Sequence, residues 1–450
     1  TSVSCRIRPS RTLADTRQMI AAKESTVKLT EVNLIDPDRF VRQEHHEMFK
    51  VLRDQAPVFL HQDPNGPAFW NVVKHADLVE VNRDAERYSS EIGGTSIPDY
   101  ENRSDEGAMD TRGVMMLTTD PPKHTRYRRL VNKGFTPRMI GLIEQYLRHR
   151  AILIVDNVIE KGEADFVVDI ASELPLQAIA EIMGVPQEDR MMLFEWSNRL
   201  IGIDDPEYSA KNDEGTVAAM ELYAYTNQLA KDRAANPRDD IVTKLINAEI
   251  DGDKLSELEF DMFMLLLTVA GNETTRNATA HGMLALMDNP EQFEIVKESP
   301  DGVTDTHIDE ILRWATPVLH FRRTATTDAE IRGQHIDEGD KVVMWHISAN
   351  RDEEVFDNPF TFDVNRTPNE QIAFGGGGAH YCLGANLAKM ELRLIFQEII
   401  ERMPDIHRVG EPEWLRSNFI GGVKHLPVAW TPGPRVNPGP APDQNLSTLV

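Results

Sequence analysis

Cys382 directly follows a glycine-rich segment, AFGGGGAHY, and stands just ahead of an expected helix. Glycines permit backbone angles and close approaches that side chains forbid, so this loop can lie flat against a large planar partner. A helix N-terminus also offers free N–H groups and positive potential, which stabilise a thiolate. Both features suit a cysteine that ligates iron.

The cysteine loop has other interpretations when its residues are considered alone. A single cysteine is often an inert buried residue, and a glycine run can form a flexible loop or a phosphate-binding loop. No Gly-Lys-Ser/Thr follows the glycines here, which disfavours a phosphate loop. One cysteine also cannot build a tetrahedral zinc site.

The segment AGNETT, residues 270–275, sets the acid Glu273 beside the hydroxyl of Thr274 within an apolar stretch. An acid is costly in an apolar helix unless it is hydrogen-bonded or functional. The structural alternative is that Thr274 and Thr275 hydrogen-bond to carbonyls of the preceding turn and bend the helix. The segment is therefore a candidate functional site.

Two further segments carry polar pairs at helical spacing. Glu310 and Arg313 lie three residues apart, and His124 and Arg128 lie four apart at the start of an expected helix. Residues at these spacings share a helix face, so the first pair can form an ion pair and the second can hold a carboxylate. Each pair taken alone could equally belong to a solvated surface.

Three expected helices position these groups. The first runs from Ser256, which can cap it together with Glu259, to Asn289, and at roughly 1.5 Å per residue it is about 48 Å long. Its apolar middle predicts burial on all sides. The second, residues 308–315, ends before a proline. The third starts after Cys382, and its polar stripe consists of Lys389, Arg393, Gln397 and Glu401.

Composition narrows the class of protein. The 48 basic residues against 73 acidic ones give a net charge of −25, which disfavours nucleic acid and anionic lipid surfaces as partners. The longest apolar stretch, Phe263–Gly271, is shorter than the roughly 20 residues that span a bilayer. With no signal-peptide pattern, we expect a cytoplasmic protein without a membrane anchor. Cys5 and Cys382 cannot form a disulfide framework.

One mainly helical domain with small sheets is the expected architecture. We place it at residues 31–432, with strand candidates such as AEIRG and DKVVMW. Residues 1–30 are polar and lack sustained periodicity, which predicts a flexible arm. Residues 433–450 hold too many prolines for helix or sheet and predict a disordered tail.

Taken together, the motifs resemble the cytochrome P450 family. Its haem-binding signature is matched by Gly378, His380, Cys382 and Gly384. Phe374 stands eight residues before the cysteine, where the family usually has seven, so the loop is one residue longer. The same insertion is found in the actinobacterial branch that hydroxylates sterol side chains and methyl-branched lipids. The strings AGNETTRNATAHG, ILRWATPV and SANRDEEVF are similar to that branch.

This resemblance implies the P450 fold, with haem b lying between the long helix and the cysteine loop and with Cys382 as the axial ligand of the iron. Along the long helix, beside Ala270, Gly271 would open the helix and Thr274 would hydrogen-bond dioxygen. Glu273 would help to relay protons. The loop residues Phe374, Gly378 and Gly384 would contact the haem, and its propionates would be held by His124, Arg128, Arg323 and His380.

In the family, Glu310 and Arg313 brace the core behind the haem, often with a third member, an arginine. Thr361 occupies that third position here. The sequence leaves two possibilities, a brace completed by Arg366 or a brace of two members.

The implied reaction inserts one oxygen atom of O2 into a C–H bond, which makes the protein a monooxygenase. A haem protein that isomerises without O2, or a haem sensor, would not need the Glu273–Thr274 pair. Because the chain shows no flavin or nicotinamide domain, electrons must come from a partner, and the resemblance implies a ferredoxin that is reduced from NAD(P)H by a ferredoxin reductase. A possible docking patch, or else a solvated surface, consists of Arg129, Lys133, Lys389 and Arg393.

The resemblance favours terminal hydroxylation of a sterol side chain, as in cholesterol or cholestenone, or of a methyl-branched lipid. An acyclic terpene alcohol such as linalool, or a fatty acid, is the alternative. We expect a monomer with an apolar pocket lined by Val269, Ala270, Val318, Leu319, Met115, Met116, Leu117 and Phe419.

Overall fold

The computed structural model describes residues 27–98, 113–132, 137–209, 213–238, 240–250 and 253–440. Cys5 and most of the predicted arm lie outside these ranges. The helices are α2 (Pro37–Val41), α3 (His45–Gln55), α4 (His75–Arg83), α5 (Lys123–Asn132), α6 (Pro137–Val158), α7 (Glu173–Met183), α8 (Arg190–Ile201), α9 (Glu214–Ala235), α10 (Ile241–Ile246), α11 (Glu257–Asp288), α12 (Pro290–Lys297), α13 (Asp305–Ala315), α14 (His346–Ala349) and α15 (Ala385–Arg402). A π-helical turn, η5, covers Val167–Ala171.

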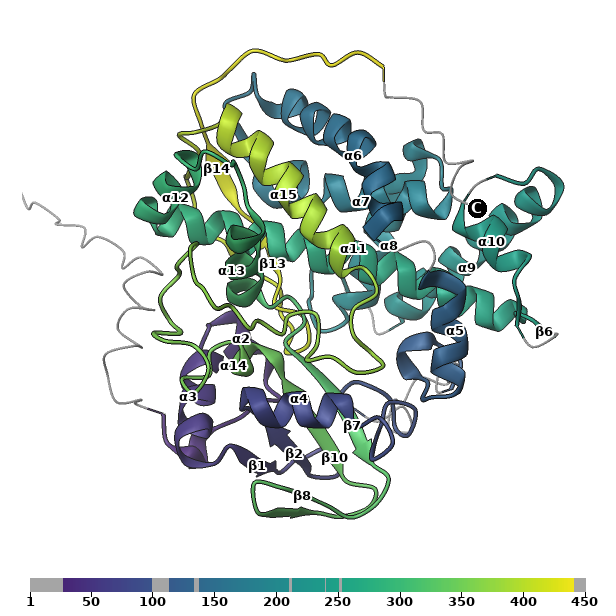
Figure 1. Ribbon diagram of the computed structural model, residues 1–450, viewed down its shortest axis with the longest axis vertical. Helices are drawn as coiled ribbons and strands as arrows, with labels where there is room; N and C mark the ends of the chain where they lie inside the picture. Colours follow the sequence, from purple (N-terminus) through teal and green to yellow (C-terminus); the bar gives the residue numbers. More distant parts are fainter. Residues whose placement is uncertain are drawn as a thin grey trace, which may run out of the picture.

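The strands are short and belong to five small sheets. They are β1 (Val58–His61), β2 (Phe69–Val72), β3 (Tyr88–Ser89), β4 (Glu163–Asp165), β5 (Glu249–Ile250), β6 (Asp253–Lys254), β7 (His320–Ala325), β8 (Ala329–Ile331), β9 (Gln334–Ile336), β10 (Lys341–Trp345), β11 (His407–Arg408), β12 (Glu413–Trp414), β13 (Val423–His425) and β14 (Pro427–Ala429). The largest sheet has the order β1-β2-β10-β7-β3 and lies at one end of the molecule, below most of the long helices (Figure 1). The expectation of a mainly helical fold with small sheets is confirmed.

The long central helix forms as predicted. Ser256 caps α11: its Oγ accepts from the Glu259 N–H, and the Ser256 N–H donates to the Glu259 carboxylate over 2.8 Å. The helix crosses the middle of the molecule behind α15 (Figure 1). At Gly282 a Cβ would lie 2.6 Å from Ile311 and 2.8 Å from Phe396, so the missing side chain lets α13 and α15 pack directly on α11.

The two other predicted helices also form. The second is longer at its start than predicted, because Thr304 caps α13 through the His307 N–H. It ends at Thr316, which adopts a left-handed conformation (φ 40°) directly before Pro317. The N-cap of α15 is Gly384, two residues after Cys382. Helix α13 thus brings its charged pair against the core, and α15 begins at the cysteine loop.

The described part of the C-terminal segment, residues 433–440, is hydrogen-bonded to α6, whereas a disordered tail was expected. Residues 433–440 have no helix or strand, but Asp156 of α6 accepts from the N–H groups of Val436 (2.9 Å) and Asn437 (2.8 Å). A ring nitrogen of His149 also lies 2.9 Å from the Gly439 carbonyl. Prolines exclude helix here, yet the free N–H groups between them can bond to a neighbouring helix. Residues 441–450 lie outside the described ranges.

Within the described residues, no helix is both long enough and apolar enough to cross a membrane.

Candidate active site

The glycine loop is held in a fixed shape by α4. Gly377 and Gly378 have φ angles of 101° and 78°, in the region that favours glycine. The Asn82 amide donates to the Gly377 carbonyl over 2.8 Å, and Arg83 donates to the carbonyl of Gly376 over 3.0 Å. A Cβ on Gly378 would lie only 2.5 Å from the Asn82 carbonyl oxygen. Glycine is therefore required for this close contact, which the sequence did not predict.

Cys382 emerges from this loop with its backbone N–H bonded to the Phe374 carbonyl over 3.0 Å. The side chain of Cys382 is exposed. Burial raises the pKa of the Cys382 thiol, while the Gly384 N–H and the Arg128 charge act in the opposite direction. A metal cation at the sulfur would favour the thiolate further.

One face of α11 is accessible although the helix runs through the centre of the molecule. Ala270 is exposed within this otherwise buried stretch. The half-buried residues beside it are Leu265, Leu266, Val269, Gly271 and Thr274. Leu266, Ala270 and Thr274 stand four residues apart and thus share one helix face. We infer that this stripe borders an internal space, and apart from Thr274 its lining is apolar.

Thr274 and Glu273 point in different directions. The Thr274 hydroxyl, on the accessible stripe, donates to the Ala270 carbonyl over 2.9 Å. Glu273 is 1% exposed and forms an ion pair with Arg276, whose Nη1 donates to Asn198 of α8 over 2.7 Å. Burial raises the pKa of Glu273, and Arg276 opposes this rise. Glu273 and Thr274 are therefore not in contact, although the spacing of three residues between Glu273 and Arg276 could have indicated this ion pair.

The helix is not opened at Gly271, contrary to what the resemblance implied. Helix α11 is continuous from Glu257 to Asp288. A Cβ on Gly271 would lie 2.8 Å from Cδ1 of Ile179. In this structure the glycine therefore allows α7 to pack closely against α11.

Four donors gather at the cysteine loop: His124 and Arg128 of α5, Arg323 of β7 and His380 of the loop itself. The rings of His124 and His380 lie 4.1 Å apart, and His380 Nε2 lies 3.1 Å from the Ser90 hydroxyl. Burial, then the charges of Arg128 and Arg323, lower the pKa of His124 to about 4. Burial also lowers the pKa of Arg323 to about 10. Among the described residues no carboxylate lies within ion-pair distance of Arg323, so this cluster has donors and positive charge in excess.

The charged pair of α13 is a buried network with three members. Glu310 and Arg313 are both fully buried and joined by two contacts of 2.7 Å. Arg366 adds a third ion pair, from Nε to Glu310 Oε2, over 3.1 Å. Arg313 also donates to the carbonyls of Asn350 and Pro359, over 2.9 Å each. This answers the question that the sequence left open, since Arg366 completes the brace.

Comparison with known proteins decides the family. The family model described as Cytochrome P450 matches residues 88–404. The chain belongs to the cytochrome P450 family.

Named relatives of this P450 include two kinds of enzyme. A steroid C26-monooxygenase of Mycolicibacterium smegmatis is 46% identical over 88% of this chain and 93% of its own length. A methyl-branched lipid omega-hydroxylase of Mycobacterium tuberculosis is 41% identical over 85% of this chain and 90% of its own. A solved P450 of Mycobacterium marinum in complex with pseudoionone shares 36% identity and a TM-score of 0.83, covering 90% of this chain and 100% of that one. The chain is thus a P450 monooxygenase that uses haem b and O2.

The donor set fits the haem of this P450. The excess of donors at His124, Arg128, Arg323 and His380 is what two propionate carboxylates would neutralise. The exposed thiol of Cys382 is the group that would ligate the haem iron. Gly384 has no atom within 4 Å of where a Cβ would lie, so the start of α15 is open as well.

The predicted pocket residues of the P450 fall into two groups. Partly exposed ones are Val269, Val318, Met115, Leu117 and Phe419. Leu319 and Met116 instead belong to hydrophobic clusters, at 3% and 8% exposure. Both side chains pack against neighbouring apolar residues in this structure, and their place in the substrate pocket stays a prediction.

Two of the basic residues in the predicted docking patch form ion pairs with acidic side chains of the protein itself. Lys389 pairs with Asp309 over 2.6 Å, and Arg393 lies 3.5 Å from Asp305 and 3.6 Å from Glu144. Arg129 is exposed, and Lys133 lies outside the described residues.

Proposed function

We propose that this P450 hydroxylates the terminal carbon of a sterol side chain or of a methyl-branched lipid. The observation that carries the proposal is the 46% identity, over nearly the whole of both chains, with a steroid C26-monooxygenase. The 41% identity to a methyl-branched lipid omega-hydroxylase supports the same class of reaction. The apolar stripe of α11 suits a hydrophobic substrate, since it would bury apolar surface on binding.

We assign the cofactor contacts as follows. Cys382 supplies the thiolate ligand, and thiolate ligation gives the haem iron the capacity to cleave the O–O bond and insert oxygen into a C–H bond. The four donors, His124, Arg128, Arg323 and His380, hold the propionates. Phe374 closes the loop through its carbonyl contact with the Cys382 N–H.

Thr274 is the hydroxyl that we place at the reacting centre. Its position on the accessible stripe lets the hydroxyl turn from the Ala270 carbonyl toward a bound molecule. Glu273 points about 100° around the helix from Thr274 and is held by Arg276, so a proton can reach Thr274 from Glu273 only after the Arg276 contact loosens. We therefore assign Glu273 a supporting role in proton supply and Thr274 the direct one.

Electrons enter through a partner protein, which we propose to be a ferredoxin reduced by a ferredoxin reductase. Arg129 is the exposed cation that we place in its docking surface. Lys389 and Arg393 contribute if the partner's acids displace Asp309 and Asp305.

Difference spectra of the ferric holoenzyme would test the substrate class. We expect cholestenone and a methyl-branched fatty acid to shift the Soret band at micromolar concentration, and linalool to do so more weakly. With a ferredoxin system, mass spectrometry would then locate oxygen on a terminal side-chain carbon. The absence of any shift with sterol and branched lipid, or oxygen on a ring carbon, would overturn the proposal.

A terpenoid substrate is the second candidate. It is favoured by the Mycobacterium marinum P450 that was solved in complex with pseudoionone. Pseudoionone and a straight-chain fatty acid therefore belong in the same screen, and tighter binding of either than of cholestenone would favour it.

A further inference from the structure

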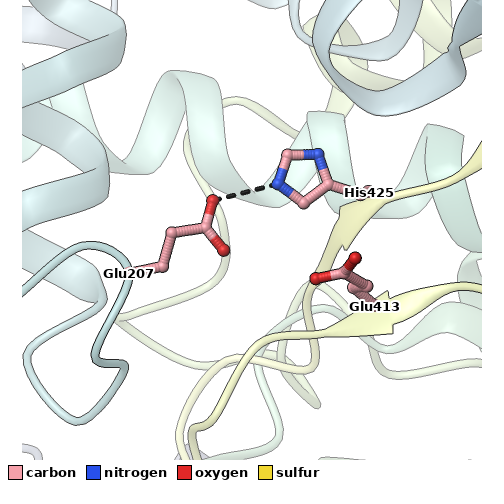
Figure 2. A group of neighbouring side chains, drawn as sticks. All are labelled: Glu207, Glu413 and His425. Atoms are coloured by element: carbon pink, nitrogen blue, oxygen red, sulfur yellow. Dashed lines mark hydrogen bonds and ion pairs between the residues drawn. The ribbon is translucent and has the colours of Figure 1, made fainter.

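One group of polar side chains that the proposed function does not use has the composition of a metal site. Glu207, Glu413 and His425 bring ligand atoms within 4.8 Å of one another (Figure 2). However, the two ring nitrogens of His425 already lie 2.9 Å from Glu207 and 2.5 Å from Asp165. The Lys424 ammonium lies 2.5 Å from Glu207 as well. These charges satisfy one another, so we interpret the group as an ion-pair network.

The charge of Arg323 is not satisfied in this way. Arg323 is 3% exposed, and it donates from Nη1 to the Arg322 carbonyl over 2.9 Å and from Nη2 to the side-chain oxygen of Asn82 over 3.2 Å. Both acceptors are uncharged. A buried guanidinium without a counter-charge is costly, so neutral acceptors must fix its direction until an anion binds. Asn82 is one of the two acceptors that fix where Arg323 points.

The amide of Asn82 also holds the cysteine loop. Asn82 is 5% exposed, and its Nδ2 donates to the Gly377 carbonyl over 2.8 Å. The two bonds determine how the amide is oriented, because a flipped amide would set its NH2 group against the guanidinium and its oxygen against a carbonyl. One planar side chain thus joins Arg323 to a residue of the loop that carries Cys382.

Helix α4 presents a short face to this loop. Val79, Asn82 and Arg83 stand three and four residues apart and so share one side of the helix. A Cβ on Gly376 would lie 2.7 Å from Val79, and Arg83 donates to the Gly376 carbonyl over 3.0 Å. All three residues therefore hold the loop. Asn82 is the one of the three that also hydrogen-bonds to Arg323 within the described residues.

We propose that Asn82 is a positioning residue that couples the propionate donor Arg323 to the loop of the thiolate ligand. The proposal rests on the cofactor contacts assigned above and is independent of the substrate class. Because the guanidinium and the loop are bonded to the same amide, neither can move freely without the other. A propionate that binds Arg323 therefore stabilises the loop that carries Cys382, and the ligated loop stabilises Arg323 by the same free energy.

The coupling has a consequence for the electronic state of the haem. Hydrogen bonds and charges around a haem ligand set its reduction potential. Loss of the Asn82 amide would loosen the loop, whose N–H groups face the Cys382 sulfur, and would release Arg323 from its position. Both changes remove positive potential from the haem. We therefore expect the reduction potential to fall when the amide is lost.

Haem transfer to apomyoglobin and the reduction potential of the holoenzyme test the coupling. We expect Asn82→Leu to speed haem transfer about tenfold and to lower the potential, as for the loss of two buried hydrogen bonds. The isosteric Asn82→Asp should act in the same direction. Its carboxylate cannot donate to the Gly377 carbonyl, and it competes with a propionate for Arg323. Amide hydrogens of the loop, residues 375–382, should exchange faster in both variants.

The matched control is Asn71→Leu, because Asn71 of β2 also bridges two segments through a buried amide. Asn71 is 0% exposed, donates to the Phe59 carbonyl over 3.1 Å and accepts from the Trp345 indole over 2.7 Å. Its loss should lower the free energy of unfolding about as much as Asn82→Leu does. It should leave haem transfer and the reduction potential unchanged, whereas a purely structural role of Asn82 predicts equal effects of the two variants.

Double-mutant cycles separate coupling from independent roles. In the Arg323→Gln background the Asn82 amide has already lost one partner, so Asn82→Leu should speed haem transfer only about threefold or less. Arg83→Met removes a different bond to the loop and none to Arg323. It should therefore speed haem transfer by the same factor with and without Arg323.

Two results would overturn the coupling. One is an equal factor for Asn82→Leu in the wild-type and Arg323→Gln backgrounds. The other is unchanged haem transfer and potential in both Asn82→Leu and Asn82→Asp; should the leucine variant fail to fold, the isosteric variant carries the same test. If Arg323→Gln alone leaves haem retention unchanged, the propionate assignment fails and the coupling with it, while the substrate class stays open to its own screen.

Discussion

Arg366 donates from Nε to Oε2 of Glu310 over 3.1 Å, although 56 residues separate the two in sequence. The position at which the family often has its third brace member is occupied by Thr361, whose side chain is exposed. The Thr361 carbonyl nevertheless accepts from Arg366 over 2.9 Å and from Arg313 over 3.2 Å. An arginine five residues later therefore fills the same role.

Arg366→Gln should destabilise the folded holoenzyme by about 2 kcal/mol, since it removes one of two cations from a buried carboxylate. Guanidinium unfolding followed by circular dichroism measures the change. Arg435→Gln, which removes an exposed pair with Glu160, is the control and should change stability by less than about 0.5 kcal/mol. Equal effects in the two variants would show that Arg366 is not part of the brace.

Local features of this P450 could be predicted from sequence because neighbouring residues determine them. The capping box of Ser256 and Glu259 and the pair of Glu310 and Arg313 each depend on a spacing of three residues. The cysteine loop was recognisable for the same reason.

Contacts between distant segments could not be predicted in this way. Asn82 meets Gly377 across 295 residues, and no periodicity relates them. The ion pair of Glu273 and Arg276, by contrast, is local, and its spacing of three residues could have predicted it. Whether Leu319 belongs to the core or to the pocket could not be predicted either, because an apolar residue suits both equally well.

Arg323→Gln should weaken haem retention. Arg323 is buried without a carboxylate partner among the described residues, so a propionate is the anion that would compensate its charge. We expect haem transfer to apomyoglobin to become at least about tenfold faster, as for the loss of a buried charge-assisted hydrogen bond. Arg332→Gln, at a half-buried pair with Asp77, should leave the transfer rate unchanged. An unaltered rate in Arg323→Gln would contradict the propionate assignment.

Thr274→Ala should uncouple the reaction, so that electrons are consumed without forming hydroxylated product. The variant removes the hydroxyl from an otherwise apolar stripe, so protons are delivered without a positioned donor. Product per electron should fall about tenfold or more, with peroxide rising in its place. Thr274→Ser keeps the hydroxyl and should retain most of the coupling. If Thr274→Ala stayed fully coupled, Thr274 would have only its structural bond to Ala270.

Glu391→Met should stabilise the protein at pH 7. Glu391 is buried in α15, and its Oε2 has no hydrogen-bond partner within the part of the chain that the structure describes. Burial raises the pKa of this carboxyl well above its ordinary value, so wild-type stability declines as the pH rises above 4.5. Methionine fills a similar volume without the buried polar group, which should add about 1 to 3 kcal/mol. A loss of stability would mean that Glu391 has a partner when haem is bound.

The holoenzyme should lose stability in weak acid because several histidines are buried in the neutral form. Burial lowers the pKa of His320 to about 4, below the ordinary 6.5, and its Nδ1 lies 3.0 Å from the Asn418 carbonyl. A lowered folded-state pKa means that the unfolded chain binds protons first, so stability falls as the pH drops below 6.5. Between pH 6.5 and 5 this single group contributes about 2 kcal/mol of that loss. In His320→Gln the decline measured by guanidinium unfolding should be smaller by that amount, whereas the exposed His407→Gln should decline like the wild type. Parallel curves for all three proteins would show that the protonation of His320 is not linked to folding.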